Sequence, residues 1–220
     1  MNDTDNTGRT GARWFNTIAV AVATIALVVV AFFASQYWFG ASEPVEGAAG
    51  TEAPVIGGPF TLTDQHGNTV TDADFRGRYM LVYFGFTYCP DVCPTALATI
   101  TEAMNRLGDA ADKIVPILIT VDPERDTPEQ LKMYAGHFSP RLVALTGTPE
   151  QIAGVAKTYR IYYAKVAEEG ADDNAYTMDH SAIAYLMGPD GAYLRHFSHA
   201  TTADQMVERL REIVAPAAAS

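Results

Sequence analysis

Two uninterrupted apolar segments constrain the fold of this chain more than any other feature of its sequence. They cover residues 79–86 (YMLVYFGF) and 114–121 (IVPILITV), and neither contains a charged residue. Apolar runs of four to eight residues are short for a helix but fit a strand whose two faces are both buried. The segments therefore predict two central strands of a sheet that is covered on both faces.

Further strand and helix patterns alternate around these two segments. Residues 60–70 read as a hairpin, and two helices are predicted to begin at the repeated Thr-Pro-Glu-Gln of residues 127–130 and 148–151. In both, threonine can cap the helix, proline suits its first position, and glutamine stands where a capping box needs it. Other predicted strands are 142–145, 161–166, 182–187 and 192–197, and other predicted helices are 95–107 and 202–214. The order predicts an α/β fold with a mixed sheet flanked by helices.

The N-terminal part is too apolar for an ordinary soluble segment. Residues 14–42 carry no charge, and about 20 apolar residues suffice to cross a bilayer, whereas a cleavable signal has a shorter apolar region. Residues 14–39 are therefore predicted to be an uncleaved transmembrane helix. Arg9 and Arg13 precede it, and no Lys or Arg follows before Arg76. The positive-inside rule then predicts a single-pass protein of the inner (cytoplasmic) membrane, with residues 1–13 in the cytoplasm and the remainder on the periplasmic side.

The remaining boundaries follow from composition. Residues 40–58 are rich in Gly, Ala, Pro and Glu and read as a flexible linker, residues 59–214 as one folded domain, and 215–220 as a disordered tail. The polar residues 168–174 read as an exposed insertion. A formal net charge of -11, with no cluster of basic residues, argues against a nucleic-acid partner.

The only two cysteines, Cys89 and Cys93, follow the first buried segment. A position near a helix N-terminus favours the thiolate. Positions four apart on a helix place Cβ atoms about 5 to 6 Å apart, whereas a disulfide needs about 3.8 Å. The spacing thus leans toward a metal, although a structural disulfide and a redox pair remain open. It also differs from the two-residue spacing of thioredoxin-type redox motifs.

The histidines bear on which metal two cysteines could hold. A closed zinc site needs four ligands, while Cu(I) is satisfied by two thiolates and one further ligand. Four of the five histidines, His66, His137, His196 and His199, are expected to face solvent. His180 has different neighbours.

Three sequence blocks in this order resemble the Sco/SenC family of copper proteins. They are FGFTYCPDVCPTAL (residues 84–97), VDPERDTPEQL (121–131) and YTMDHSAIAYLMGPDG (176–191). The resemblance implies a thioredoxin-like domain on a membrane anchor, involved in assembling the copper centre of cytochrome c oxidase. It also implies that Cys89 and Cys93 are thiolate ligands of copper, Cu(I) or Cu(II), and that His180 is the imidazole ligand. Phe86 and Ala175 depart from the family pattern, but neither change removes a ligand.

Three acidic residues in these blocks have two readings each. Asp122 and Asp126 could cap and turn the chain ahead of the helix at Thr127, or act beside the metal site. Asp179 could orient His180 or merely face solvent.

The combined features predict a copper metallochaperone rather than an enzyme. Its expected partners are the copper-bearing subunit of cytochrome c oxidase and a thiol reductase that keeps the sulfurs reduced. The alternative is a thiol:disulfide oxidoreductase acting on exported proteins, in which His180 serves as a local acid or base. A peroxide-reducing enzyme is a more distant third possibility.

Overall fold

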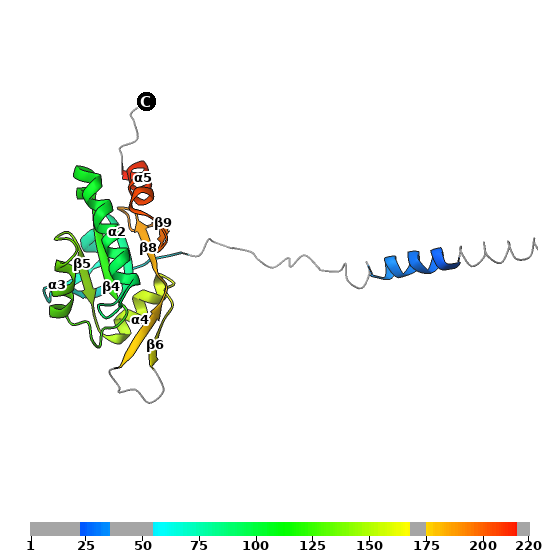
Figure 1. Ribbon diagram of the computed structural model, residues 1–220, viewed down its shortest axis with the longest axis horizontal. Coiled ribbons are helices and arrows are strands. Elements are labelled where there is room, and N and C mark those ends of the chain that lie inside the picture. The colour runs from blue at the N-terminus through cyan, green and yellow to red at the C-terminus, as the bar shows by residue number, and fades with distance from the viewer. Residues whose placement is uncertain (1–22, 36–54, 168–174, 215–220) are drawn as a thin grey trace, which may run out of the picture. The chain divides into compact units, whose positions relative to one another are not determined.

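The computed structural model describes residues 23–35, 55–167 and 175–214. The chain divides into two compact units, Met1–Glu52 and Ala53–Ser220. The second unit holds the sheet and the helices around it (Figure 1).

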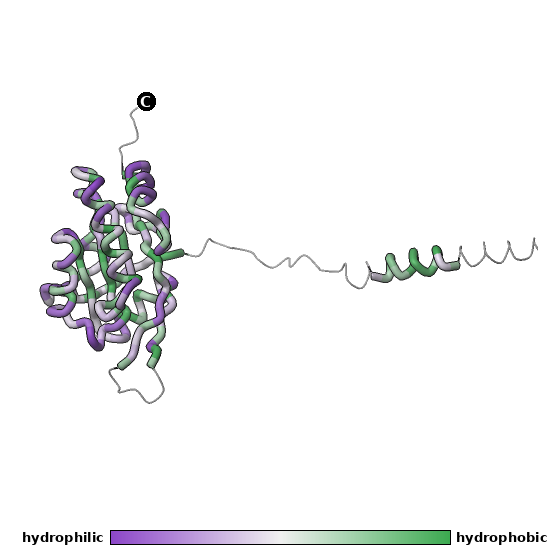
Figure 2. Tube along the Cα trace, in the orientation of Figure 1, coloured by the Kyte–Doolittle hydropathy of each residue, from purple (hydrophilic) through white to green (hydrophobic). Residues whose placement is uncertain are grey.

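The described part of the first unit is a single helix over residues 23–35. It is apolar on nearly all sides, and large side chains such as Leu27 and Phe33 are about two-thirds exposed, at 69% and 66% (Figure 2). At 1.5 Å per residue its length is about 20 Å, which is less than a hydrocarbon core of about 30 Å. Among the residues that the structure describes, no helix is long and apolar enough to span a membrane. The rest of the span predicted for residues 14–39 lies outside the described residues.

The second unit is organised around one seven-stranded sheet of mixed direction. Its strand order is β2-β1-β5-β4-β3-β8-β9. The strands are β1 (Thr61–Asp64), β2 (Thr69–Thr71), β3 (Tyr79–Gly85), β4 (Ile114–Thr120), β5 (Val143–Thr146), β8 (Ile183–Met187) and β9 (Tyr193–Ser198). β4 runs parallel to both β3 and β5, and the other neighbours are antiparallel. The mixed α/β sheet predicted from the sequence is confirmed.

The two apolar segments form the centre of this sheet. All seven residues of β4 are buried, as are all residues of β3 except Tyr79. Helices supply the remaining cover: α2 (Val92–Leu107), α3 (Pro128–Gly136), α4 (Pro149–Thr158) and α5 (Ala203–Val214), with the short 3₁₀ helices η1 (Asp72–Phe75) and η2 (Gly108–Lys113). α2 packs against α5, α3 against β5, and α4 against β1. The flanking helices carry many hydrophilic residues, whereas hydrophobic residues gather along the central strands (Figure 2). The domain is consistent with a thioredoxin-like fold.

The two Thr-Pro-Glu-Gln repeats start α3 and α4 as predicted, but they do not cap them equally. The hydroxyls of Thr127 and Thr148 accept hydrogen bonds from the backbone N–H groups of Gln130 and Gln151. The Gln151 side chain completes the box by accepting from Thr148 N at 2.8 Å. At α3 the expected box is only half formed, because Thr127 N–H already donates to the Arg125 carbonyl.

A second, two-stranded sheet stands apart from the main one. It pairs β6 (Tyr163–Ala167) with β7 (Tyr176–His180) in antiparallel register, with Tyr163 opposite His180. The sequence patterns predicted a strand at 161–166 but none at 176–180. The polar residues 168–174, predicted to be an exposed insertion, lie outside the described residues. This hairpin is important because its last residue is His180.

Candidate metal centre

The cysteines lie between the end of β3 and the first turn of α2. Cys89 is half-buried in the connecting loop, and Cys93 is fully buried in the first turn of α2. α2 begins at Val92, three residues ahead of the helical spacing that starts at Thr95. Pro94 does not prevent this, because the first-turn amides of a helix have no partner within the helix. The early start brings Cys93 onto the helix.

The sulfur of Cys89 takes the place of a helix cap. Cys93 N–H donates to Cys89 Sγ at an N···S distance of 3.4 Å. Asp91 stands at the N-cap position, but its side chain accepts from no backbone amide, contrary to the capping role that its type suggests. Both cysteines are free in the structure. The Cys89 sulfur therefore lies at the positive end of the helix dipole.

His180 reaches the cysteines from the end of β7. Its Nε2 is 3.4 Å from Cys93 Sγ, and its Nδ1 is 3.3 Å from the Ser181 carbonyl oxygen. Because a carbonyl only accepts, this contact favours a proton on Nδ1 and leaves the Nε2 lone pair directed toward the sulfur. The rings of Phe86 and Tyr83 pack edge-to-face with the imidazole, with their centroids 5.8 Å and 6.3 Å from the imidazole centroid.

The donor atoms of Cys89, Cys93 and His180 all lie within 4.8 Å of one another. Within residues 23–35, 55–167 and 175–214, this is the one group of three or more His, Cys, Asp or Glu side chains placed so closely. Metal bonds of about 2.3 Å to sulfur and 2.0 Å to nitrogen, with zinc as the guide, bridge donor pairs up to about 4.6 Å apart. Two sulfurs and an imidazole thus fit one metal ion with little movement, and they form a soft donor set.

Burial keeps Cys93 and His180 uncharged before a metal binds. Burial raises the pKa of the Cys93 thiol to about 12. Burial also lowers the pKa of His180, against smaller opposing effects of the Ser181 carbonyl and the Asp179 charge. At neutral pH, Cys93 is a thiol beside a neutral imidazole. A metal ion would replace the thiol proton.

Two tyrosines that the sequence reasoning did not assign to the site, buried Tyr83 and half-buried Tyr134, lie near the sulfurs. Burial raises the pKa of both hydroxyls, and the neighbouring cysteines raise it further. Tyr83 belongs to β3, and Tyr134 to α3. The sequence signal that could have pointed to Tyr83 is its position, six residues before Cys89 on the strand that leads into the cysteine loop.

Gly85 makes room for the Cys93 sulfur. A Cβ atom added at Gly85 would lie 2.9 Å from Cys93 Sγ and 2.9 Å from Cε1 of Tyr83. Real Cβ contacts are not this short, so any side chain at position 85 must displace the sulfur or the ring.

Gly85→Ala is accordingly expected to lower the free energy of unfolding by about 1 to 3 kcal/mol through overpacking. Urea denaturation of the metal-free chain measures it. Gly154→Ala is the matched control, because Gly154 lies within α4 and a Cβ there meets nothing within 4 Å. The control is expected to be neutral or to stabilise by about 0.5 to 1 kcal/mol. Equal effects of the two substitutions would contradict this account of Gly85.

The other candidates near His180 have different roles. Asp179 is exposed, and its carboxylate makes none of the side-chain hydrogen bonds found among the described residues, so the Ser181 carbonyl, rather than Asp179, orients the ring. Met178 packs against the hydrophobic core. The remaining histidines are exposed, as expected: His66, His137, His196 and His199.

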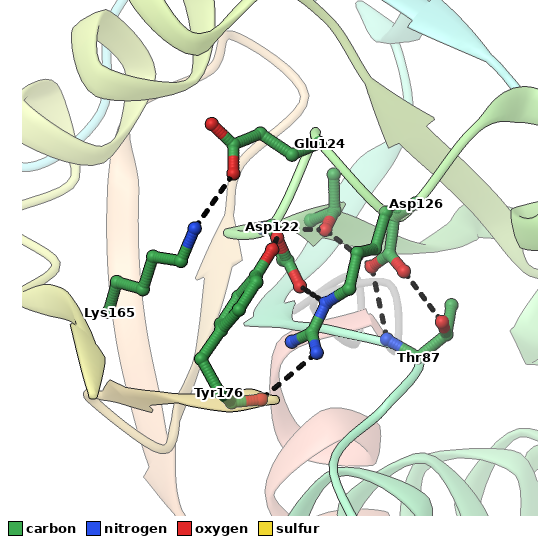
Figure 3. A network of polar contacts seen from close by, with 8 residues as sticks. Thr87, Asp122, Glu124, Asp126, Lys165 and Tyr176 are labelled. Carbon is green, nitrogen blue, oxygen red and sulfur yellow. Dashed lines mark hydrogen bonds and ion pairs between the residues drawn. The ribbon is translucent and has the colours of Figure 1, made fainter. Parts of the chain in front are cut away.

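Asp122 and Asp126 hold the two segments that carry the donor atoms (Figure 3). Asp126 is fully buried and accepts from Thr87 N at 3.0 Å, Thr87 Oγ1 at 2.6 Å and Thr120 Oγ1 at 2.6 Å. Asp122 accepts from the Tyr176 hydroxyl at 2.7 Å and pairs with Arg125. Neither caps α3, whose N-cap is Thr127. Asp126 thus anchors the cysteine loop, and Asp122 the His180 hairpin.

Comparison with known proteins identifies the family. Residues 48–215 match the SCO1/SenC family model. The chain belongs to the SCO1/SenC family. It is 46% identical over 146 residues to the mouse mitochondrial SCO1 homolog, a match covering 66% of this chain and 51% of the mouse protein. The chain therefore spans about half the length of that relative.

Solved structures of SCO proteins share this architecture. A structure of Bradyrhizobium japonicum ScoI with copper bound is 46% identical, with a TM-score of 0.66, covering 71% of this chain and 98% of that one. An Arabidopsis thaliana ScoI structure with copper bound is 39% identical, with a TM-score of 0.67, covering 72% of this chain and 98% of that one.

Proposed function

We propose that this chain is a copper-binding protein that carries copper on Cys89, Cys93 and His180. It delivers copper to, or prepares, the copper centre of cytochrome c oxidase. The observation that carries the proposal is the convergence of two sulfurs and one imidazole nitrogen within 4.8 Å. The copper-bound SCO structures support the choice of metal, since these relatives share both family and fold.

The donor set suits copper as a cargo. Two thiolates and an imidazole satisfy Cu(I) with three ligands, and an acceptor offering more ligands can then remove it by ligand exchange. Cys89 is half-buried rather than enclosed, which leaves a side of the site open to an acceptor. The sulfurs must be reduced before loading, so a thiol reductase is an expected partner.

The proposal includes a place at the membrane. Residues 1–13 would lie in the cytoplasm, 14–39 would anchor the chain, and 40–58 would tether the domain formed by 59–214, ahead of the tail 215–220. The charge asymmetry around the apolar segment supports an inner-membrane protein with its folded domain on the periplasmic side. In that position the domain can reach a copper-bearing oxidase subunit in the same membrane.

Anaerobic titration of the full chain with Cu(I) tests the metal proposal. We expect one copper per reduced chain, and the loss of tight binding in Cys89→Ser and His180→Ala. Unchanged stoichiometry and affinity in both variants would overturn it.

The affinity for Cu(I) is expected to increase with pH. Because the pKa of Cys93 is raised to about 12, copper must displace its proton at every pH from 6 to 8. Each displaced proton increases the apparent affinity by about tenfold per pH unit. His180 adds no further pH dependence above the usual pKa range of histidine, because its lowered pKa leaves the imidazole neutral there. Competition titrations at pH 6, 7 and 8 measure the slope, and an affinity that is flat across this range would contradict it.

A thiol:disulfide oxidoreductase is the second candidate. It is favoured by the contrast between half-buried Cys89, which a substrate disulfide could reach, and buried Cys93 behind it, which could resolve a mixed disulfide. Turnover of a dithiol-disulfide substrate by the copper-free chain would support this activity. If turnover is absent while copper binds tightly, the metallochaperone proposal alone remains.

A further inference from the structure

The hairpin that carries His180 has no backbone ladder to the main sheet. Within the part of the chain that the structure describes, β7 pairs with β6 and with no other strand. At the His180 end, the bond from Ser181 N to the Tyr162 carbonyl, at 3.0 Å, extends the pairing of β7 with the chain of β6. Its other end, at Tyr176, depends on side-chain contacts to keep it against the domain.

Those contacts come from the loop between β4 and α3. The Tyr176 hydroxyl donates to Asp122 at 2.7 Å, and the Tyr176 carbonyl accepts from Arg125 Nη1 at 2.9 Å (Figure 3). The Arg125 guanidinium also lies over the Tyr176 ring, with Cζ 3.6 Å from the ring centroid. One residue of the hairpin is therefore held by its ring, its hydroxyl and its backbone.

The same arginine contacts the cysteine loop. Its Cζ lies 4.6 Å from the centroid of the Tyr88 ring, and Tyr88 directly precedes Cys89. We call Tyr88, Asp122, Arg125 and Tyr176 the Arg125 clamp. The clamp connects the neighbour of one proposed sulfur ligand to the strand that carries the proposed nitrogen ligand.

The chemistry of the clamp requires an arginine. The side chains of Arg125 and Asp122 are 14% and 3% exposed, so the ion pair is largely shielded from water. A planar guanidinium can contact two aromatic rings while donating to a carboxylate and a carbonyl, whereas an ammonium is a compact point charge without that geometry.

Strand geometry explains how the clamp could act on His180. Tyr176, Met178 and His180 alternate with exposed residues and therefore share one face of β7. Tyr176 and His180 are four residues apart, about 13 Å along a strand. Holding the Tyr176 side chain fixes the rotation of the strand about its axis, and this rotation aims the imidazole.

We propose that Arg125 is a positioning residue for His180: the clamp holds β7 so that the imidazole stays within reach of the two sulfurs. The inference rests on the proposed function for its effect on copper, but not for its effect on the hairpin. It assigns Arg125 no direct contact with the metal.

A double-mutant cycle measures the effect on copper. Arg125→Ala is expected to weaken Cu(I) binding by the full chain about tenfold, a change of about 1.4 kcal/mol. In the His180→Ala background the same substitution should change affinity by less than about twofold, because the ligand it positions is gone. An equal loss in both backgrounds, or no loss where His180→Ala itself weakens binding, would overturn the inference.

Amide hydrogen exchange of the copper-free chain separates this inference from the proposed function. Arg125→Ala is expected to speed exchange of the amides of β6 and β7 by about tenfold and to leave β3 and β4 unchanged. If His180→Ala leaves copper affinity intact, the proposed function fails, and the clamp is judged by exchange alone. Wild-type exchange rates in β7 of Arg125→Ala would then refute it.

Two further variants protect against a trivial loss of folding. Arg125→Lys keeps the charge and should give an intermediate effect in both measurements. Lys165→Ala is the matched control: Lys165 also lies over the Tyr176 ring, at 3.8 Å, but it is 47% exposed and pairs with exposed Glu124. It is expected to change copper affinity by less than about twofold. A Lys165→Ala effect as large as that of Arg125→Ala would show that any contact to Tyr176 suffices, and would overturn the specific role of Arg125.

Discussion

Replacing Cys93 by serine is expected to weaken Cu(I) binding by more than about 100-fold. The loss of a hydrogen-bond partner behind a metal ligand already costs about 10- to 100-fold in affinity, so the loss of a proposed ligand should cost more. Serine keeps the size of the side chain but exchanges a soft sulfur for a hard oxygen, which Cu(I) does not favour. Competition with a chromophoric Cu(I) chelator under anaerobic conditions gives the affinity.

His180→Ala should fall in the same range, and His199→Ala provides its control. His199 is exposed and lies outside the group of converging donors. Its removal is therefore expected to leave affinity within about twofold. Similar losses from His199→Ala and His180→Ala would show that copper binds elsewhere.

Asp126→Ala is expected to produce the largest loss of stability, about 3 kcal/mol in the free energy of unfolding. The substitution leaves the Thr87 N–H and the hydroxyls of Thr87 and Thr120 without their acceptor in a buried region. Each unsatisfied buried polar group costs about 1 to 3 kcal/mol. Part of this cost is offset, because the substitution also removes a carboxyl whose burial is unfavourable for its charged form, as its raised pKa indicates. Denaturant unfolding of the copper-free chain measures the change.

Two comparisons sharpen the test at Asp126. Asp126→Asn retains one acceptor oxygen and should cost about 1 kcal/mol. Asp112→Ala removes an ion pair with Arg141 whose side chains are 66% and 50% exposed, and should change stability by less than about 0.5 kcal/mol. If Asp126→Ala proved as mild as Asp112→Ala, the anchoring of the cysteine loop by Asp126 would be wrong.

The sheet was predictable because its central strands have a strong local signal. Residues 79–86 and 114–121 carry no charge and are almost wholly apolar, and both form buried central strands as β3 and β4. β7 was missed because it is only five residues long and its inward-facing residues, Tyr176, Met178 and His180, are only half-buried. α2 begins at Val92, ahead of the helical spacing of residues 95–107, because the first turn of a helix tolerates Pro94.

The site could be assembled from sequence only through the resemblance of its three blocks to a family. Spacing placed Cys89 beside Cys93, but nothing local to His180 indicates that it reaches the Cys93 sulfur, 87 residues earlier in the chain. The two readings of Asp122 and Asp126 depended on tertiary contacts to Tyr176 and Thr87 that no local pattern encodes. The roles of Gly85 and Arg125 were missed for the same reason.

X-ray absorption of the anaerobically loaded full chain tests the central claim most directly, because it counts the sulfur and nitrogen ligands of the bound copper. The account predicts two sulfur ligands and one imidazole nitrogen in the wild type, and loss of the nitrogen in His180→Ala. A spectrum with sulfur ligands alone, unchanged by His180→Ala, would contradict it.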